Sequence, residues 1–157
     1  MFKINDLKNC VVLILDHTSQ MTIDRCEDCT FVLGPIKNSI FVRDSKNCQI
    51  TVSCGQFRCR TLFDSSIKLY CPQEPVVESS SGLTLSPYNL KWSQLEEFSQ
   101  AAELIGEFTD EEGATHQKIN HWKEVHDFTP AEEGSNYELV AQDDFQVVNF
   151  SAIADEH

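Results

Sequence analysis

The sequence predicts a mainly β protein: a right-handed parallel β-helix of about five coils, followed by a packed C-terminal α-helix and an extended acidic tail. Two observations predict the β-helix. Cys10, Cys29 and Cys48 are equally spaced, as in a 19-residue repeat, and each follows an Asn or Asp. The apolar residues around them alternate with a period of two, which is typical of strands that bury one face.

Each repeat supplies two short strands. Apolar residues lie two and four positions after each cysteine, and a second pair lies eleven and thirteen positions after it; in the third repeat this second pair is Cys59 and Thr61. Degenerate copies end near residues 64–66 and 80–82. Stacked repeats pair equivalent strands in parallel, about 4.8 Å apart. We expect the cysteines to form a buried ladder and the preceding Asn and Asp to form the turns.

The pattern changes after Pro87, so residues 1–88 are expected to form the β-helix. Apolar residues then recur at helical spacing at Trp92, Leu95, Phe98, Ala102 and Ile105. This stripe predicts one amphipathic helix over residues 91–105 that packs on the β-helix. Residues 106–120 are polar, and we expect them to form a loop.

A second group of apolar residues follows this loop. Trp122, Val125 and Phe128 predict a short anchor that returns to the body, so residues 89–130 comprise the helix and the anchor segment. The acidic remainder, residues 131–157, is expected to be an extended and partly mobile tail.

Charge is distributed unevenly along the chain. The net charge is −13, from 25 acidic and 12 basic residues. The excess acid lies in residues 96–157, whereas the arginines lie in the first half. Nucleic acid is excluded as a partner, because binding to a phosphate backbone needs a clustered basic surface. An anionic ligand is therefore expected to bind the first half.

The chain has the features expected of a cytoplasmic protein. No apolar run reaches the roughly 18 residues of a transmembrane helix, and no signal peptide opens the chain. Phe2 rather than Gly follows Met1, so we expect membrane attachment only through a lipid anchor of a parent protein, which is missing here. The seven cysteines are expected to be reduced thiols.

The sequence offers little evidence for a catalytic activity of the chain itself. Cys26 and Cys29 have C-x-x-C spacing, but no second ligand pair lies nearby, so both are assigned to the core and no metal site is expected. The chain has no phosphate-binding G-x-x-x-x-G-K-[ST] loop, and its histidines have no recognisable nucleophile context. We therefore do not expect an enzyme in its own right.

One strand segment carries two arginines on a single outer face. Strand alternation places Phe57 and Cys59 inside, and it places Gln56, Arg58 and Arg60 outside. Taken alone, such a pair is most simply a solvated surface feature steadied by a carboxylate, worth at most about 1 kcal/mol.

Neighbouring coils add residues to this outer face. The 19-residue register places Arg58 beside Ser39 and the second arginine beside Phe41, and Arg43 follows on the same face. An 18-residue step into the next coil brings Glu78 beside the second arginine.

Five segments in fixed order carry a family resemblance. They are Thr22-Ile23-Asp24 with Cys26-Glu27-Asp28-Cys29, residues 33–41, Gln56-Phe57-Arg58, Val77-Glu78-Ser79-Ser80-Ser81 and His126-Asp127-Phe128-Thr129-Pro130. Together they resemble the tubulin-binding cofactor C domain family, most closely the version in the X-linked retinitis pigmentosa 2 protein. The likeness covers nearly the whole chain.

The resemblance implies a β-helix that activates a GTPase through an arginine finger. Carried over by position, the catalytic residues are Arg58 and Gln56, and Glu78 supports the finger surface. The register adds four partner-binding residues, which are Arg60, Phe41, Ser39 and Arg43. The implied partner is an Arf-like small GTPase or tubulin in its GTP state. It would carry the GTP and Mg²⁺, so the chain needs no cofactor of its own.

One departure keeps a second hypothesis open. Gly55 stands where the family usually has the first of two glutamines. The alternative is a non-catalytic effector or scaffold that binds tubulin, actin or a small GTPase, as the related β-helix of adenylyl-cyclase-associated proteins binds actin monomers. The family resemblance implies a location at the cytoskeleton, including the basal body or cilium. The chain is expected to be a monomer.

Overall fold

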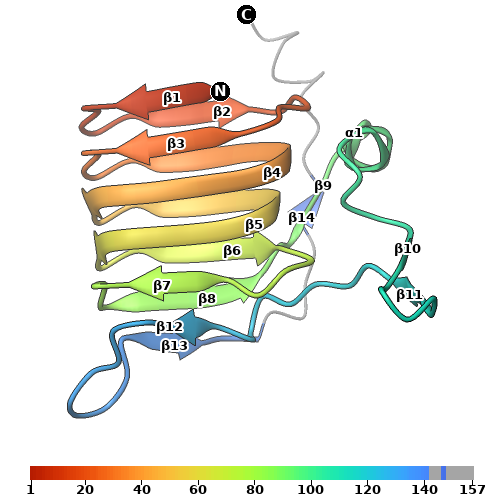
Figure 1. Cartoon of the computed structure of the whole chain (residues 1–157). Helices are drawn as coiled ribbons and strands as arrows, with labels where there is room; N and C mark the ends of the chain where they lie inside the picture. Colours follow the sequence, from red (N-terminus) through yellow and green to blue (C-terminus); the bar gives the residue numbers. More distant parts are fainter. Residues whose placement is uncertain (142–145, 148–157) are drawn as a thin grey trace, which may run out of the picture.

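The structure, a computed structural model, describes residues 1–141 and 146–147. It is a parallel β-solenoid of about five turns with one short helix beside it, which confirms the predicted fold class (Figure 1). The elements in chain order are β1 (Phe2–Asn5), β2 (Val11–Ile14), β3 (Met21–Asp24), β4 (Thr30–Lys46), β5 (Gln49–Phe63), β6 (Ser66–Tyr70), β7 (Val76–Glu78), β8 (Leu83–Pro87), β9 (Leu90–Lys91), α1 (Leu95–Ala101), β10 (Glu107–Thr109), β11 (Thr115–Gln117), β12 (His126–Asp127), β13 (Tyr137–Leu139) and β14 (Gln146–Val147).

Two rows of parallel strands enclose the core. One row contains β1, β3, the second halves of β4 and β5, then β7 and β12. The other contains β2, the first halves of β4 and β5, then β6, β8 and β13. Inward side chains such as Phe31 and Phe57 are fully buried. Because Cys59 is also buried while Arg58 and Arg60 are exposed, the predicted alternation of this strand is confirmed.

Each coil turns at one edge through two residues with positive φ, three positions apart. The first position is held by Asp6, Arg25, Asp44, Thr61 and Ser79, and the second by Asn9, Asp28, Asn47, Asp64 and Gly82. Left-handed backbone favours Asn, Asp and Gly, which explains the Asn and Asp ladder at the second position. The cysteines that follow, Cys29 and Cys48, are buried, and Cys10 in the end coil is half-buried.

The coils differ in length at the opposite edge. Between β4 and β5 the expected 19-residue register holds where Thr30 lies beside Gln49, but it is shorter by two where Ser39 lies beside Gln56. The register breaks around the cis peptide between Gly34 and Pro35, where β4 accommodates two extra residues. The 19-residue step therefore holds in both rows as far as β4, and from β4 to β5 it holds only in the row that contains β2.

The arginine strand is consequently shifted by two residues from its predicted position. Arg58 lies beside Phe41 rather than Ser39, and Arg60 lies beside Arg43 rather than Phe41. The predicted register was wrong because a constant period cannot show where one coil is shortened.

The same shift changes the second apolar pair of the third repeat. That pair is Phe57 and Cys59, which lie beside Ile40 and Val42. It is not Cys59 and Thr61, because Thr61 occupies a corner with a φ of 54°.

The helix is shorter than predicted, since α1 covers Leu95–Ala101 rather than residues 91–105. The preceding Leu90–Lys91 is extended and pairs with β14. Glu103 has a φ of 59°, which is incompatible with a continued helix. Trp92 is buried, as expected for a residue of the apolar stripe.

The segment after the helix also differs from the expectation. The predicted loop contains an antiparallel hairpin, in which Glu107 of β10 pairs with Gln117 of β11. Trp122 and Val125 pack against the core, as an anchor should. Phe128 is instead 61% exposed, so it does not serve as an anchor.

Part of the predicted tail belongs to the solenoid, because β13 pairs in parallel with β8. In the other row, β12 pairs with β7 at the same end of the solenoid. Apart from β14, the tail beyond Ala141 lies outside the described residues. Among the described residues, the structure has no helix that is long and apolar enough to cross a membrane.

Candidate functional site

One outer face of the solenoid gathers arginines around a single aromatic ring. The guanidinium carbons of Arg43, Arg58 and Arg60 lie 5.4, 5.3 and 5.8 Å from the centroid of the Phe41 ring. Each such cation–π contact stabilises by about 0.5–1 kcal/mol at an exposed site. The ring therefore holds together three like charges that would otherwise repel. We call the outward surface of β3, β7, β12 and the second halves of β4 and β5 the arginine face.

Arg43 is anchored by a nearly buried carboxylate. Asp24 is 7% exposed, and its Oδ2 accepts hydrogen bonds from Arg43 at 2.9 Å and from Arg25 at 3.0 Å. Asp24 Oδ1 and Arg43 Nε are buried without a partner among the described residues. Arg25 also hydrogen-bonds Asp6, and this contact lowers the pKa of the Asp6 carboxyl. These contacts make Arg43 a fixed member of the cluster.

Arg58 and Arg60 lack such a counterion. Within the described part of the chain, neither forms an ion pair or a hydrogen bond through its guanidinium group. Glu78 lies beside Arg60 in the next coil, as the 18-residue step predicted. It nevertheless forms no ion pair with that arginine. Two exposed cations therefore lie together, uncompensated, on a chain with a net charge of −13.

Neutral polar side chains border the arginines. Gln56 lies beside Ser39, and the Ser39 hydroxyl accepts a hydrogen bond of 3.4 Å from Gln20. Gln56 and Arg58 are two residues apart on one strand, so both side chains point outward on the same face. The structure thus brings the two predicted catalytic residues together.

Gly55 is required by a close approach of the preceding coil. A Cβ at this position would lie 2.4 Å from the Lys37 carbonyl oxygen and 2.5 Å from that of Asn38. The glutamine usual in the family cannot be placed here unless that backbone moves. In this chain, glycine at position 55 therefore fits the close approach of the backbone at Lys37 and Asn38.

The structure adds three residues at the arginine face that the sequence did not assign to it. Val76 lies beside Arg58, and His126 lies beside Val76. The exposed Phe128 packs its ring edge-on against His126, with 4.5 Å between the ring centroids. The 18-residue step that identified Glu78 also leads from Arg58 to Val76. No repeat signal leads to the residues of β12, because that strand lies outside the repeats.

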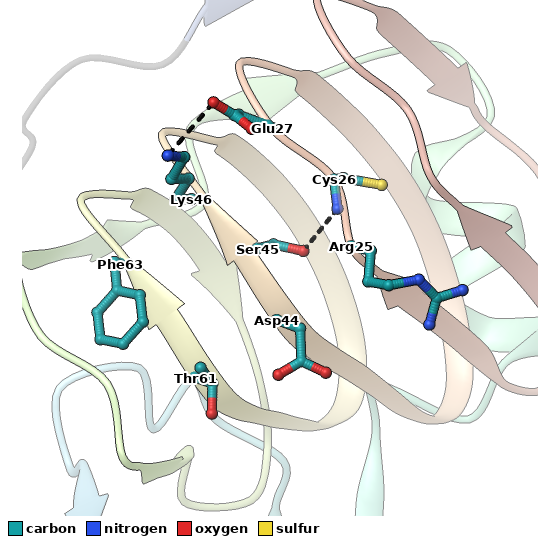
Figure 2. Close-up of a pocket in the computed structure, with 8 residues that line it drawn as sticks. All are labelled: Arg25, Cys26, Glu27, Asp44, Ser45, Lys46, Thr61 and Phe63. Carbon is teal, nitrogen blue, oxygen red and sulfur yellow. Dashed lines mark hydrogen bonds and ion pairs between the residues drawn. The ribbon is translucent and has the colours of Figure 1, made fainter.

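The hollow in Figure 2 lies at the edge where the coils turn through their positive-φ residues, which we call the corner edge, rather than on the arginine face. It encloses about 330 Å³. Two polar contacts lie within it: Lys46 pairs with Glu27 at 3.4 Å, and Ser45 accepts a hydrogen bond from the Cys26 backbone at 3.0 Å. Neither Arg58 nor Gln56 lines it. Arg58 and Arg60 are exposed on the outward side of β5, and such a surface suits a macromolecular partner better than a small ligand.

The C-x-x-C pair belongs to the core, as expected. Cys26 and Cys29 are each 1% exposed, and their thiols point to backbone carbonyls within 3.6 Å. Burial raises the pKa of Cys26, and it raises the pKa of Cys48 to about 11. The described residues contain no group of three or more His, Cys, Asp or Glu that could hold a metal ion.

Comparison with known proteins points to one family. Residues 1–128 match the family described as tubulin binding cofactor C. The chain is 35% identical over 143 residues to Protein XRP2 of Homo sapiens, covering 90% of this chain and 37% of that protein. It is 28% identical over 125 residues to Tubulin-specific chaperone C of Homo sapiens, covering 80% of this chain and 33% of that protein.

A solved structure supports the fold independently. The structure of Tubulin Binding Cofactor C from Leishmania major matches with a TM-score of 0.65 and 22% sequence identity, over 83% of this chain and 84% of that chain. The chain spans about a third of the length of the curated relatives it matches.

Proposed function

The chain belongs to the tubulin binding cofactor C family, and from this premise we propose that it is a GTPase-activating protein. Its partner is tubulin or a small GTPase of the Arf-like class, bound to GTP. Arg58 acts as an arginine finger in trans, and the chain supplies no nucleotide or metal. This function belongs in the cytoplasm at the cytoskeleton, with the basal body or cilium as specific sites.

The observation that carries the proposal is the state of Arg58. Its guanidinium is exposed and lacks a carboxylate partner among the described residues, yet it is held over the Phe41 ring. Stacking reduces the conformational freedom that an arginine loses on binding, because the planar group is already oriented. A structural arginine would instead be neutralised by an acidic neighbour, as Arg43 is by Asp24.

The chemistry follows from charge. Phosphoryl transfer spreads negative charge over the γ-phosphate oxygens, and a guanidinium placed there stabilises the transition state by about 10³–10⁵ in rate. Arg58 donates to these oxygens, and Gln56 donates or accepts beside it to orient the attacking water. Arg60 and Arg43 raise the positive potential of the face, which speeds association with an anionic partner.

The rest of the face supplies the docking contacts. Ser39, Phe41 and Glu78 surround the arginines, and Phe128 with Val76 adds apolar surface at the far side. Interfaces typically combine aromatic and arginine anchors with a polar rim. The exposed ring of Phe128 fits such an anchor.

A non-catalytic effector or scaffold is the second candidate, and Gly55 favours it. Because a Cβ is excluded at this position, the chain cannot present a side chain between Cys54 and Gln56. If the family's first glutamine takes part in hydrolysis, this chain binds a GTPase, tubulin or actin without accelerating hydrolysis.

A single-turnover GTPase assay distinguishes the two functions. Tubulin and Arf-like GTPases are each loaded with GTP and mixed with saturating amounts of this chain. Stimulated hydrolysis is expected with one of them, and Arg58→Ala should remove about 10³–10⁵-fold of it. Binding of the partner loaded with a non-hydrolysable GTP analogue should weaken by less than about tenfold.

Two controls locate the effect. Lys68→Ala removes an outward cation from the opposite row of strands and should leave stimulation unchanged. Arg60→Ala tests whether the neighbouring arginine is the finger instead; a larger loss there than with Arg58→Ala contradicts the assignment. An unchanged hydrolysis rate at saturating binding contradicts the activator and supports the scaffold.

A further inference from the structure

One carboxylate of the arginine face is nearly buried. Asp24 is the last residue of β3, and it lies beside Arg43 of β4 in register. Among the described residues it is the only charged residue that is buried. A buried charge is costly unless it is paired and hydrogen-bonded. Oδ2 of Asp24 meets this need by accepting hydrogen bonds from Arg43 and Arg25.

The contacts of Asp24 constrain position more than they add stability. Oδ1 of Asp24 and Nε of Arg43 are buried without a partner in the described part of the chain. Each unpaired buried polar atom lowers stability, and a buried ion pair is often no more stabilising than apolar packing of the same volume. The remaining hydrogen bond, from Nη2 of Arg43 to Oδ2 at 2.9 Å, nevertheless fixes where the guanidinium lies.

Arg43 transmits this constraint to the Phe41 ring. The two residues are two positions apart on β4, so both side chains point outward on the same side of the sheet. The Arg43 guanidinium carbon lies 5.4 Å from the ring centroid while its Nη2 is held by Asp24. An anchored guanidinium beside the ring restricts the orientations that the ring can adopt.

The ring in turn orients Arg58. Phe41 lies directly beside Arg58 in the next coil, with 5.3 Å between the ring centroid and the guanidinium carbon. An exposed cation–π contact contributes little energy, so it is readily lost if the ring turns. Asp24 protects the contact in a second way, because Arg43 repels Arg58 less when a carboxylate neutralises it.

We propose that Asp24 is a positioning residue for the arginine finger: by holding Arg43 beside the Phe41 ring, it keeps that ring oriented for Arg58. The effect on GTP hydrolysis rests on the proposed function. The orientation of the Arg58 side chain is a property of this chain alone, and it can be measured without a partner.

Nuclear magnetic resonance of the ¹⁵N-labelled chain tests the orientation. The Nε–Hε signal of Arg58 carries the ring-current shift of Phe41, and Phe41→Leu gives the position of this signal without the ring. Asp24→Asn keeps the size of the side chain and removes its charge, so it should move the signal toward the Phe41→Leu position. Asp6→Asn is the matched control: it removes the other carboxylate that pairs with Arg25, and it should leave the signal at its wild-type position.

The single-turnover GTPase assay measures the consequence for hydrolysis. At saturating amounts of the chain, Asp24→Asn should lower the stimulated rate about two- to fivefold, which corresponds to the loss of one exposed cation–π contact. Binding of the partner should not weaken, because the finger is misplaced rather than removed. Asp6→Asn should stimulate hydrolysis as the wild type does.

A double variant tests whether Asp24 acts through Arg43. Once Arg43→Gln has removed the intermediate residue, adding Asp24→Asn should change neither the Arg58 signal nor the rate. The side chains of Arg25 and Arg43 are 54% and 34% exposed, so they stay hydrated when Asp24 loses its charge, and the variants should fold. Circular dichroism verifies this, and Arg43→Gln alone supplies both readouts if Asp24→Asn does not fold.

Three results would overturn the role of Asp24. They are a folded Asp24→Asn, or Arg43→Gln in its place, with the Arg58 signal at its wild-type position, an equal movement of that signal in Asp6→Asn, and a double variant that is worse than Arg43→Gln alone. If the wild type stimulates none of the partners, the proposed function fails, and the resonance measurement still decides whether Asp24 orients Arg58.

Discussion

The two outer faces of the solenoid share one backbone and differ in chemistry. On the face opposite the arginine face, successive coils present Thr30, Gln49, Ser66 and Thr84 in register. These side chains are short or neutral, and none gathers charge around a ring. On the arginine face the corresponding ladder reads Phe41, Arg58, Val76 and His126. Beneath both faces the core is alike, since Phe31 and Phe57 are both fully buried.

The difference shows that the inward residues hold the coils together, whereas the outward residues are the ones that a partner would contact. Inward positions are apolar in both rows, so stability should respond equally to losses under either face. Outward positions tolerate different chemistry because they contribute little to packing. Function should therefore be lost by outward changes on the arginine face alone.

The largest expected effects come from the core, and they should be the same in both rows. Phe31→Ala and Phe57→Ala each leave a cavity and should lower the free energy of unfolding by about 3–5 kcal/mol. Urea denaturation followed by circular dichroism measures both. A loss below about 1 kcal/mol for one of them would show that the rows are not equivalent.

Gly55→Ala should have the next largest effect, because it acts where the chain passes from one face to the other. The added Cβ meets the Lys37 and Asn38 carbonyl oxygens, and the backbone must shift to relieve the contact. We expect a loss of about 1–3 kcal/mol in the free energy of unfolding. Gln56→Ala, at the adjacent outward position, is the matched control and should change stability by less than about 0.5 kcal/mol.

Phe41→Leu tests whether the aromatic ring, rather than hydrophobic bulk, organises the arginines. Losing the contacts to Arg43, Arg58 and Arg60 should lower stimulated GTP hydrolysis about tenfold with little change in stability. Phe41→Trp keeps a π face and should retain most of the stimulation. If Leu and Trp behave alike in the single-turnover assay, the ring does not position the finger.

The smallest expected effect is on stability and concerns Asp6, which directly follows β1 in the row of strands that carries the arginine face. Arg25 lowers the pKa of this carboxyl, so ionised Asp6 stabilises the fold above its unfolded pKa, and this contribution is lost as the pH falls through the folded pKa. Asp6→Asn keeps a residue that tolerates the positive φ. Its small deficit in stability should be present near about pH 7 and smaller near about pH 3, below the unfolded pKa of an Asp. Thermal melts of both proteins at the two pH values measure it; a deficit that is undiminished in acid contradicts the ion pair.

The fold could be predicted from the sequence because its repeat consists of short-range residue patterns. Cysteine spacing and two-residue alternation gave the stacked coils, and alternation alone placed Arg58 outward. The register of that arginine was not accessible, since the coil containing Gly34 and Pro35 is two residues longer than the next at one edge. The end of α1 depends on a left-handed residue at Glu103, which apolar spacing does not reveal.

The arginine face was only partly accessible for a related reason. Phe41 and Glu78 were found by stepping along the repeat, although the neighbour assigned to Phe41 was wrong. His126 lies in β12, which joins the solenoid after the helix and hairpin, and Phe128 directly follows that strand, so the repeat gives no signal for them. Their exposure is a property of the assembled fold rather than of the local pattern.

The corner edge has a consequence for how this chain can change in length. The two positive-φ residues of each corner are three positions apart in every coil, whereas coil length varies from one coil to the next. Insertions and deletions are thus confined to the side where Gly34 and Gly55 lie. A loop inserted on that side would leave the corner residues of successive coils aligned. The domain could therefore be enlarged there without displacing the residues on either sheet.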